Sequence, residues 1–362
     1  MHLNINLDWL SANRLPILGL DISTTAVKLV ELSDAGKGML RVERYVIELL
    51  PKDAVTDGNI ANLDQVGETL RTAWKNLGSR VRNVAIALPS SAVITKKILA
   101  PASLKGLDLE RQVETEANQV IPFSLDEVNL DFQVLGPSPA SPDDVQILLA
   151  AARKEKVEKR VAAAESAGLK ALVLDVESFA TQAAYEQIAH LLPNGGAGQT
   201  VAIIDIGAQN MHINVLHDNE SVYLREHGFG GNQLNNEISR RYGMTSEEAE
   251  NAKRKGTLPE SYEVEVLQPY SETLAMEIGR ALQLFTTSTQ YRKVDQILLA
   301  GGGAMIAGID EVVAQRTGTP TQVANPFANM AVGSKVRPQA LTADAPSLFV
   351  ACGLAMRRFD PQ

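Results

Sequence analysis

The chain has 362 residues, of which 45 % are apolar and 21 % are charged, and 34 basic against 43 acidic residues give a net charge of −9. This length exceeds what one core usually organises, so we expect two lobes. The acidic balance argues against nucleic acid as the main partner, and the single cysteine, Cys352, excludes an internal disulfide. We expect no signal peptide, because the N-terminus lacks a basic region followed by an apolar one. We also expect no membrane-spanning segment, because no apolar run reaches about 18 residues.

Strand-like and helical segments alternate along the first part of the chain, which predicts an α/β fold. Apolar runs predict strands at 17–21, 27–32, 39–50 and 83–89, with a helix near 60–78 between the last two.

Residues 91–152 have a different pattern, typical of a small inserted unit. Their order is strand, helix, strand, strand, and Pro122 ends the helix because its ring disfavours helical geometry just before it. The basic run at 153–160 begins a further helix. We interpret that run as a solvated helix face with Glu155 and Lys159 paired, rather than as a nucleic-acid site.

The second half repeats an element of the first half. A strand passes into a helix at 172–180, and a new strand with an acid at its end begins at 201. Helices follow, among them one with Thr245 as its predicted N-cap. The chain then closes with a strand, a glycine turn and a helix at 296–313, and a last helix reaches residue 358.

Each half opens with a hairpin whose first strand ends in an aspartate. The stretches are "ILGLDISTTAVKLVEL" (17–32) and "VAIIDIGAQNMHINVL" (201–216). Backbone N–H groups and hydroxyls in such turns can point at a phosphate, and Gly207 lets the backbone approach closely. Asp21 and Asp205 suit a magnesium ion held through water. Two ordinary hairpins with Asp at the turn are the alternative.

A third motif is "LLAGGGAMIAG", in which Gly301, Gly302 and Gly303 lie between an apolar strand and a helix. The three glycines form either a tight strand–helix turn or a flat backbone shelf for a purine and ribose.

In this order the three motifs resemble the two phosphate motifs and the adenosine motif of the actin-like ATPase superfamily. The resemblance implies an α/β, actin-like ATPase fold with two ribonuclease-H-like lobes around a nucleotide cleft, ATP and Mg²⁺ as cofactors, and an inserted β-α-β-β subdomain. The expected parts are the first lobe (1–90), the insert (91–152), a return to the first lobe (153–198), the second lobe (199–340) and a C-terminal helix that packs back on the first lobe (341–362).

Within the superfamily the chain is similar to the FtsA and PilM families. "GFGGNQLNNEISRRYGMTSEEAENAK" resembles both, whereas "ANQVIPFSLDEVNLDFQVL", "VLDVESFA" and "ACGLAMRR" resemble PilM. The PilM resemblance implies a cytoplasmic ATP-binding scaffold of the type IV pilus or a related secretion platform, peripheral at the inner membrane. It implies that the scaffold binds the cytoplasmic N-terminal tail of a PilN-like inner-membrane protein and other platform proteins. Self-association is left open.

The resemblance also implies roles for individual residues. The residues that match nucleotide-contacting positions are Asp21, Ser23, Thr24, Thr25, Lys28, Asp205, Gly207, Ala208, Gln209, Asn210, Gly230, Gly231, Glu250, Lys253, Glu277, Arg280, Gly301, Gly302 and Gly303. Gln209 and Asn210 depart from the superfamily's small turn residues. The four charged helix residues Glu250, Lys253, Glu277 and Arg280 have surface charge as their alternative interpretation.

Glu177 and Gln209 are the candidates to position a water for hydrolysis, so at most a weak ATPase is expected. An FtsA-like filament-forming ATPase is one alternative. A small-molecule kinase of the same superfamily is another, but no further acid occurs in a glycine-rich sugar loop to act as its base.

A groove between the insert and the first lobe is the predicted docking place for the partner's tail. Its candidate residues are Glu114, Asn118, Val120, Ile121, Pro122 and Phe123. Pro122 fixes the turn, and Phe123 would form an apolar wall beside an extended peptide. Alternatively, Ile121 and Phe123 fill the core of the insert itself.

Overall fold

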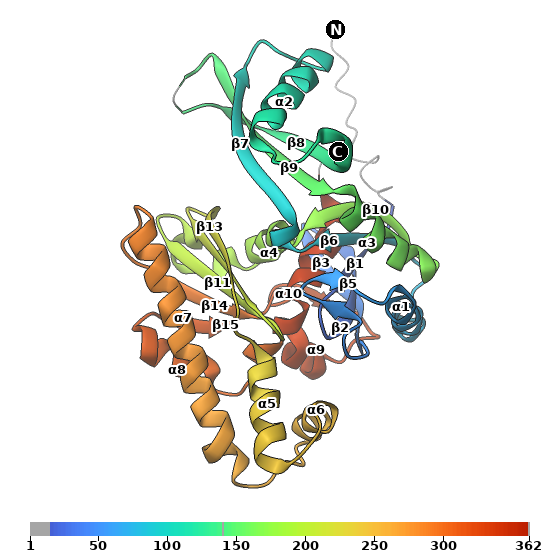
Figure 1. The fold of residues 1–362 in the computed structure, drawn as a ribbon, viewed down its shortest axis with the longest axis vertical. Helices are drawn as coiled ribbons and strands as arrows, with labels where there is room; N and C mark the ends of the chain where they lie inside the picture. Colours follow the sequence, from blue (N-terminus) through green and yellow to red (C-terminus); the bar gives the residue numbers. More distant parts are fainter. Residues whose placement is uncertain (1–14, 140, 361–362) are drawn as a thin grey trace.

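A computed structural model describes residues 15–139 and 141–360 (Figure 1). The expected absence of a signal peptide concerns residues 1–14, which lie outside this range, as do residues 361–362. Within the described residues, no helix is both long enough and apolar enough to cross a membrane.

The first sheet has the strand order β10-β6-β1-β2-β3-β16. Its strands are β1 (Leu18–Ile22), β2 (Ala26–Gly36), β3 (Met39–Leu49), β6 (Asn83–Leu88), β10 (Lys170–Val176) and β16 (Ala331–Val332). β1, β2 and β3 form an antiparallel meander, whereas β6 pairs parallel with β1 and with β10. Every residue of β1 is buried, as expected for a central strand that is covered on both faces.

The second sheet repeats this arrangement in the order β13-β12-β11-β14-β15. Its strands are β11 (Thr200–Ile206), β12 (Met211–His217), β13 (Glu220–His227), β14 (Gln296–Ala300) and β15 (Thr321–Val323). The first three strands again form an antiparallel meander, and β14 is parallel to β11 and to β15. Apart from β16 at the edge of the first sheet, both sheets therefore have the strand order 3-2-1-4-5 of a ribonuclease-H-like lobe, and the predicted fold class is confirmed.

The inserted subdomain lies at one end of the molecule, at the top of Figure 1. It consists of β7 (Val93–Pro101), α2 (Leu107–Val120), β8 (Val128–Pro137) and β9 (Asp144–Arg153), and its antiparallel sheet has the order β7-β9-β8. Val113 and Ala117 of α2 pack with Ile147 and Leu149 of β9 in its core. The predicted order of strand, helix, strand, strand is confirmed.

Helices cover the two large sheets, and a small hairpin, β4 (Val55–Thr56) with β5 (Asn59–Ile60), follows β3. The helices are α1 (Leu63–Leu77), α3 (Lys154–Ser166), α4 (Glu177–Glu186), α5 (Gly231–Tyr242), α6 (Ser246–Lys255), α7 (Gln268–Ser288), α8 (Ile309–Thr317), α9 (Pro338–Asp344) and α10 (Phe349–Met356). Thr245 caps α6 as predicted, since its hydroxyl accepts from Glu248 N and the Glu248 side chain accepts from Thr245 N.

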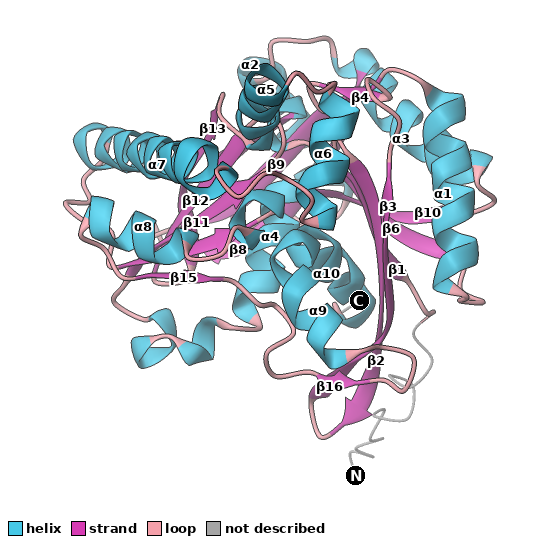
Figure 2. Cartoon of the chain, turned by 90° about the horizontal axis from the view of Figure 1, so that it is seen from below, coloured by secondary structure: helices cyan, strands magenta, loops and turns pink. Residues whose placement is uncertain are grey.

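The helices α4 and α10 lie between the two sheets (Figure 2). Ala180 of α4 and Leu354 of α10 pack on the first sheet, whereas Tyr185 of α4 and Phe349 of α10 share a core with the second sheet. Gly353 brings the two helices into backbone contact, because a Cβ there would lie 1.8 Å from Ala180 O. The two lobes are therefore joined through a tightly packed helix pair.

One predicted boundary needs correction. The sequence assigns residues 331–332 to the second lobe, but they form β16 and pair with Arg41 and Val42 at the edge of the first sheet. Burial explains the difference, because Phe327 and Met330 join the core that β2 and β3 build. A two-residue strand has no sequence pattern of its own, so its position is decided by that tertiary packing.

Candidate functional site

Asp21 and Lys28 are register partners across the β1–β2 hairpin. Their side chains form an ion pair of 2.9 Å between Lys28 Nζ and Asp21 Oδ2, and Asp21 is 6 % exposed. Burial alone would lower the pKa of Lys28, but Asp21, and with it Asp205 and Glu177, outweighs burial, so the pKa of Lys28 is raised. Lys28 is thus a largely buried cation, with 13 % of its side chain exposed, held among acids.

The turn between β1 and β2 carries the predicted hydroxyl residues. Ser23 donates to Ala26 O from its backbone N (3.0 Å) and from Oγ (2.8 Å). Thr24 is half-buried and Thr25 is exposed. The Ser23 hydroxyl therefore holds the turn, whereas Thr25 lies at the surface.

Asp205 has a basic register partner as well, which is His212 of β12. Burial raises the pKa of Asp205, while His212 and then Lys28 lower it and Asp21 raises it further. His212 was not predicted from the sequence. The register of the hairpin could have identified it, because residues directly opposite each other in an antiparallel pair lie on the same face of the sheet.

Glu177, the first residue of α4, belongs to the same group of charges. Burial raises its pKa, His212 and Arg160 lower it, and Asp21 and Asp205 raise it again. The fold thus brings Asp21, Glu177 and Asp205 together from β1, α4 and β11. We call these three residues the acid cluster.

The start of α5 packs on the turn between β11 and β12. Gly231 N donates to Gly207 O (3.0 Å), and Asn232 N donates to Ala208 O (2.8 Å). A Cβ on Gly230 would lie 2.5 Å from Gly207 O, so this contact requires glycine. The first N–H groups of α5 are therefore used to hold the turn.

The predicted glycine shelf lies against the end of β11. Gly301 has φ +83°, and a Cβ there would lie 2.2 Å from Asp205 Oδ1. A Cβ on Gly303 would lie 2.2 Å from Ile206 Cγ2, whereas nothing lies within 4 Å of the Cβ position of Gly302. Only Gly302 of the three is exposed. Gly301 and Gly303 allow close approach to β11, and Gly302 leaves an open backbone surface.

The four charged helix residues have protein partners. Lys253 Nζ lies 2.6 Å from Glu250 Oε2 and 2.8 Å from Asn235 Oδ1, which joins α6 to α5.

Glu277 of α7 contacts His227 Nε2 (2.9 Å) and Arg280 Nη1 (2.6 Å). His227 ends β13. The contact with His227 places Glu277 beside the second sheet. Arg280 is paired with Glu277, a residue of its own helix.

The two polar residues of the second turn also have partners. Gln209 Oε1 accepts from Asp57 N (3.4 Å), a contact from the second lobe to the β4–β5 hairpin of the first. Asn210 Nδ2 donates to Glu226 of β13.

The residues predicted to bind a partner divide between the surface and the core of the insert. Glu114, Asn118 and Pro122 are exposed, and Val120 is half-buried. Ile121 is 5 % exposed and lies in the insert's core.

Phe123 is half-buried, packs against that core, and lies beneath the Arg153 guanidinium at 4.1 Å from the ring centroid. Ile121 is therefore part of the insert's own core, which was the alternative to a role in the groove. Glu114 and Asn118 are accessible.

The repeated strand order, with an acid at the end of each first strand and a shared helix pair, defines a protein of the actin-like ATPase fold. The family model for "Type IV pilus assembly protein PilM" matches residues 19–359. The chain belongs to the PilM family.

The solved structure of a PilM–PilN complex agrees with this assignment. A PilM–PilN type IV pilus biogenesis complex matches with a TM-score of 0.79 and 28 % identity, over 96 % of this chain and 100 % of the other. The ethanolamine utilization protein EutJ from Carboxydothermus hydrogenoformans matches with a TM-score of 0.56 and 18 % identity, over 95 % of this chain and 91 % of the other, and is alike in fold. MreB5 of Spiroplasma citri bound to ADP has a TM-score of 0.48 and 15 % identity, over 96 % of this chain and 99 % of the other. The bound ADP belongs to that structure.

Proposed function

We propose that this protein is an ATP-binding scaffold on the cytoplasmic side of a type IV pilus platform, or of a related secretion platform. In this role it binds Mg-ATP between its lobes and docks the cytoplasmic N-terminal tail of a PilN-like inner-membrane protein. The observation that carries the nucleotide proposal is the acid cluster. In it Asp21 and Asp205 lie at the ends of the central strands of the two lobes, and Lys28 pairs with Asp21 while Asp205 also raises its pKa.

The side chains around the acid cluster suit a hydrated magnesium ion. Among the described residues, no three His, Cys, Asp or Glu side chains lie close enough to form a metal cage. Mg²⁺ usually keeps several waters and is held by one or two carboxylates together with phosphate oxygens. Asp21 and Asp205 would hold its water shell, and the ion would neutralise phosphate charge. Lys28 would supply a second positive charge to the phosphates.

The glycines of the shelf and the second turn would line the rest of the nucleotide. Gly302 would offer open backbone for a base and ribose, next to Gly301, which lies against Asp205. The turns at Ser23–Thr25 and Gly207–Asn210 would face the phosphates from the two lobes. Glu250, Lys253, Glu277 and Arg280 would need to exchange their present partners in order to reach a nucleotide.

We propose at most weak turnover. A raised pKa keeps Glu177 protonated over a wider pH range than an ordinary glutamate, and a protonated carboxyl group is a poor base for water. The other candidate, Gln209, uses its side-chain oxygen to bind Asp57 N.

Calorimetry with the variant Asp205→Asn tests the nucleotide site. The substitution removes a carboxylate at nearly constant volume, so we expect Mg-ATP affinity to fall by about tenfold or more, as for other residues that support a metal through its outer shell. Because the loss acts through the ion, the affinity difference between ATP with Mg²⁺ and ATP with a chelator should shrink.

The matched control is Asp64→Asn in the exposed first turn of α1, which should bind like the parent. Parental Mg-ATP affinity in both Asp205→Asn and Asp21→Asn would remove the basis of the proposal.

The docking proposal is supported by the likeness to a PilM–PilN complex and by the exposed residues Glu114 and Asn118 on α2. Fluorescence titration of a PilN-tail peptide tests it. Asn118→Ala should weaken peptide binding while the melting temperature stays unchanged, because Asn118 is exposed. Thr115→Ala, also exposed on α2, is the control.

Phe123→Ala separates a groove role from a core role. A loss of roughly 3–5 kcal/mol in stability would be the signature of a core side chain, whereas weaker binding at unchanged stability marks a groove wall. If Asn118→Ala and Phe123→Ala both bind the peptide like the parent, the tail docks elsewhere.

A further inference from the structure

We call the turns at Ser23–Thr25 and Gly207–Asn210 the first and the second phosphate turn. The β4–β5 hairpin lies between the second phosphate turn and the inserted subdomain. Its two-residue loop is Asp57–Gly58, with φ +48° and +71°, as expected for a type I′ turn. On one side, Asp57 N reaches Gln209 Oε1 at 3.4 Å. This hydrogen bond joins the second phosphate turn directly to the hairpin.

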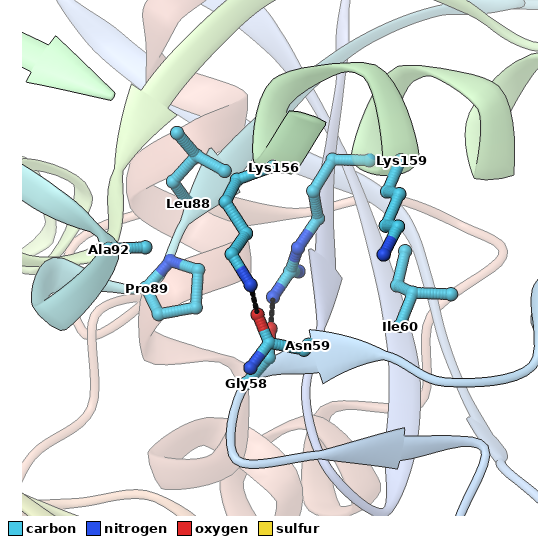
Figure 3. A pocket seen from close by; sticks show the side chains of 9 residues that line it. Gly58, Asn59, Ile60, Leu88, Pro89, Ala92, Lys156 and Lys159 are labelled. Atoms are coloured by element: carbon cyan, nitrogen blue, oxygen red, sulfur yellow. Dashed lines mark hydrogen bonds between the residues drawn. The ribbon is translucent and has the colours of Figure 1, made fainter. Parts of the chain in front are cut away.

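On its other side the hairpin touches both chain connections of the insert, which meet around the small pocket of Figure 3. Lys156 Nζ donates to Asn59 Oδ1 at 2.6 Å, and α3, which carries Lys156, follows directly from the insert's last strand. Pro89 begins the connection into the insert. A Cβ on Gly58 would lie 2.8 Å from Pro89 Cγ, so the contact is close.

Arg160 of α3 joins this hairpin to the first phosphate turn. Its Nη2 donates to Gly58 O and its Nη1 donates to Ile22 O, each at 2.8 Å. Ile22 directly precedes the Ser23–Thr25 turn, and Arg160 is only 4 % exposed.

Both acceptors of Arg160 are neutral. Among the ion pairs between described residues, none involves Arg160. Burial lowers the pKa of Arg160, and Glu177 and Asp21 oppose this effect. Glu177 and Asp21 of the acid cluster therefore offset the cost of burying this charge only in part and from a distance, and no paired carboxylate does so.

We propose that Arg160 is a positioning residue of the nucleotide site, which fixes the end of β1 and the β4–β5 hairpin in one arrangement and transmits changes there to the inserted subdomain. This inference rests on the proposed nucleotide binding. A nucleotide that draws the two phosphate turns together moves Gln209 against Asp57. Because Gly58 is bonded to α3 and abuts Pro89, both connections of the insert follow.

Hydrogen exchange with and without saturating Mg-ATP, alongside calorimetry, tests the inference. In the parent, Mg-ATP should slow exchange in the phosphate turns and also in residues 89–101 and 153–160. In Arg160→Met, protection of the phosphate turns should remain at saturation, but the change in the two insert connections should disappear. Mg-ATP affinity should fall by about tenfold or more, because hydrogen bonds from a charged group are lost.

Arg160→Lys is the second variant, for the case that Arg160→Met does not fold. It keeps the charge but cannot bridge two carbonyls with a planar fork, so affinity should partly recover while the insert connections stay uncoupled. The matched control is Arg71→Met. Exposed Arg71 donates from α1 to Ser166 O at the end of α3 (3.1 Å), so its removal deletes an arginine–carbonyl bond to the same helix.

The outcomes separate the two proposals. A parent protein that binds no Mg-ATP overturns the proposed function and this inference with it. If the parent binds Mg-ATP and Arg160→Lys shows the parental exchange change in residues 89–101 and 153–160, the role of Arg160 is wrong and nucleotide binding stands. Equal loss in Arg71→Met also overturns the role of Arg160, because any weakened contact to α3 would then be sufficient.

Discussion

Each hairpin acid faces a base across its own hairpin, Lys28 opposite Asp21 and His212 opposite Asp205. Lys28 thus offsets part of the charge of Asp21 before any ligand arrives, and His212 lowers the pKa of Asp205 against the effect of burial. Glu177 has no register partner of this kind, and His212 and Arg160 lower its pKa without offsetting burial. Ionisation of Glu177, like that of Asp205, whose pKa is also raised by burial, is therefore expected to cost stability.

Glu177→Gln should stabilise the protein at about pH 7 and have little effect near pH 4. The pKa of Glu177 in the folded protein lies above the ordinary glutamate value of 4.5, so the folded state keeps this proton to higher pH than the unfolded chain does. Stability is then lost as the pH rises through the interval above 4.5. Glutamine keeps the neutral shape and avoids this loss.

Thermal melts across this pH range measure the effect. Glu186→Gln, exposed at the end of the same helix, should follow the parent at every pH. A lower melting temperature for Glu177→Gln at about pH 7 would mean that the ionised carboxylate stabilises the fold.

At the scale of elements, the crossing of α4 and α10 depends on one glycine. Gly353→Ala places a methyl group where Ala180 O lies 1.8 Å away, so the helices must separate. We expect a loss of about 1–3 kcal/mol in the free energy of unfolding, typical of overpacking.

Gly279→Ala in α7 is the comparison. A Cβ there meets only Thr317 Cγ2, at 3.9 Å, so the substitution should stabilise by about 0.4–1 kcal/mol through the unfolded chain. Urea unfolding measures both variants. Equal effects of the two would show that the close crossing of α4 and α10 is relaxed without cost.

Elements with strong local patterns could be predicted from the sequence, and those decided by packing could not. The apolar runs that end at Asp21 and Asp205 predicted β1 and β11, and Thr245 predicted the start of α6. The Asp57–Gly58 pair is a known hairpin signal, which the sequence analysis did not use. β16 carries no such signal, because its pairing with β3 depends on the burial of neighbouring residues.

At the scale of the whole molecule, the resemblance supplied what periodicity could not. Local patterns do not state that Asp21, Glu177 and Asp205, far apart in the chain, meet in one cluster, and the superfamily motifs implied it. His212 was not predicted, because the motifs are defined by the residues of the turn and not by which residues pair across the two strands of the hairpin. The role proposed for Arg160 could not be predicted from the basic run 153–160, because the run shows no difference between Arg160 and its exposed neighbours. Of these neighbours, Glu155 and Lys159 do pair as predicted.

The repeated strand order also makes the two halves unequal in a defined way. In the second lobe, the chain that leaves the fourth strand, β14, forms the glycine turn at Gly301. In the first lobe, the chain that leaves the corresponding strand, β6, enters the insert instead. The insert thus occupies the pseudo-symmetric counterpart of the shelf. If both halves had a glycine turn, a base could bind at either of two equivalent positions. Because the insert replaces one of these turns, a nucleotide bound as proposed has a single orientation between the lobes.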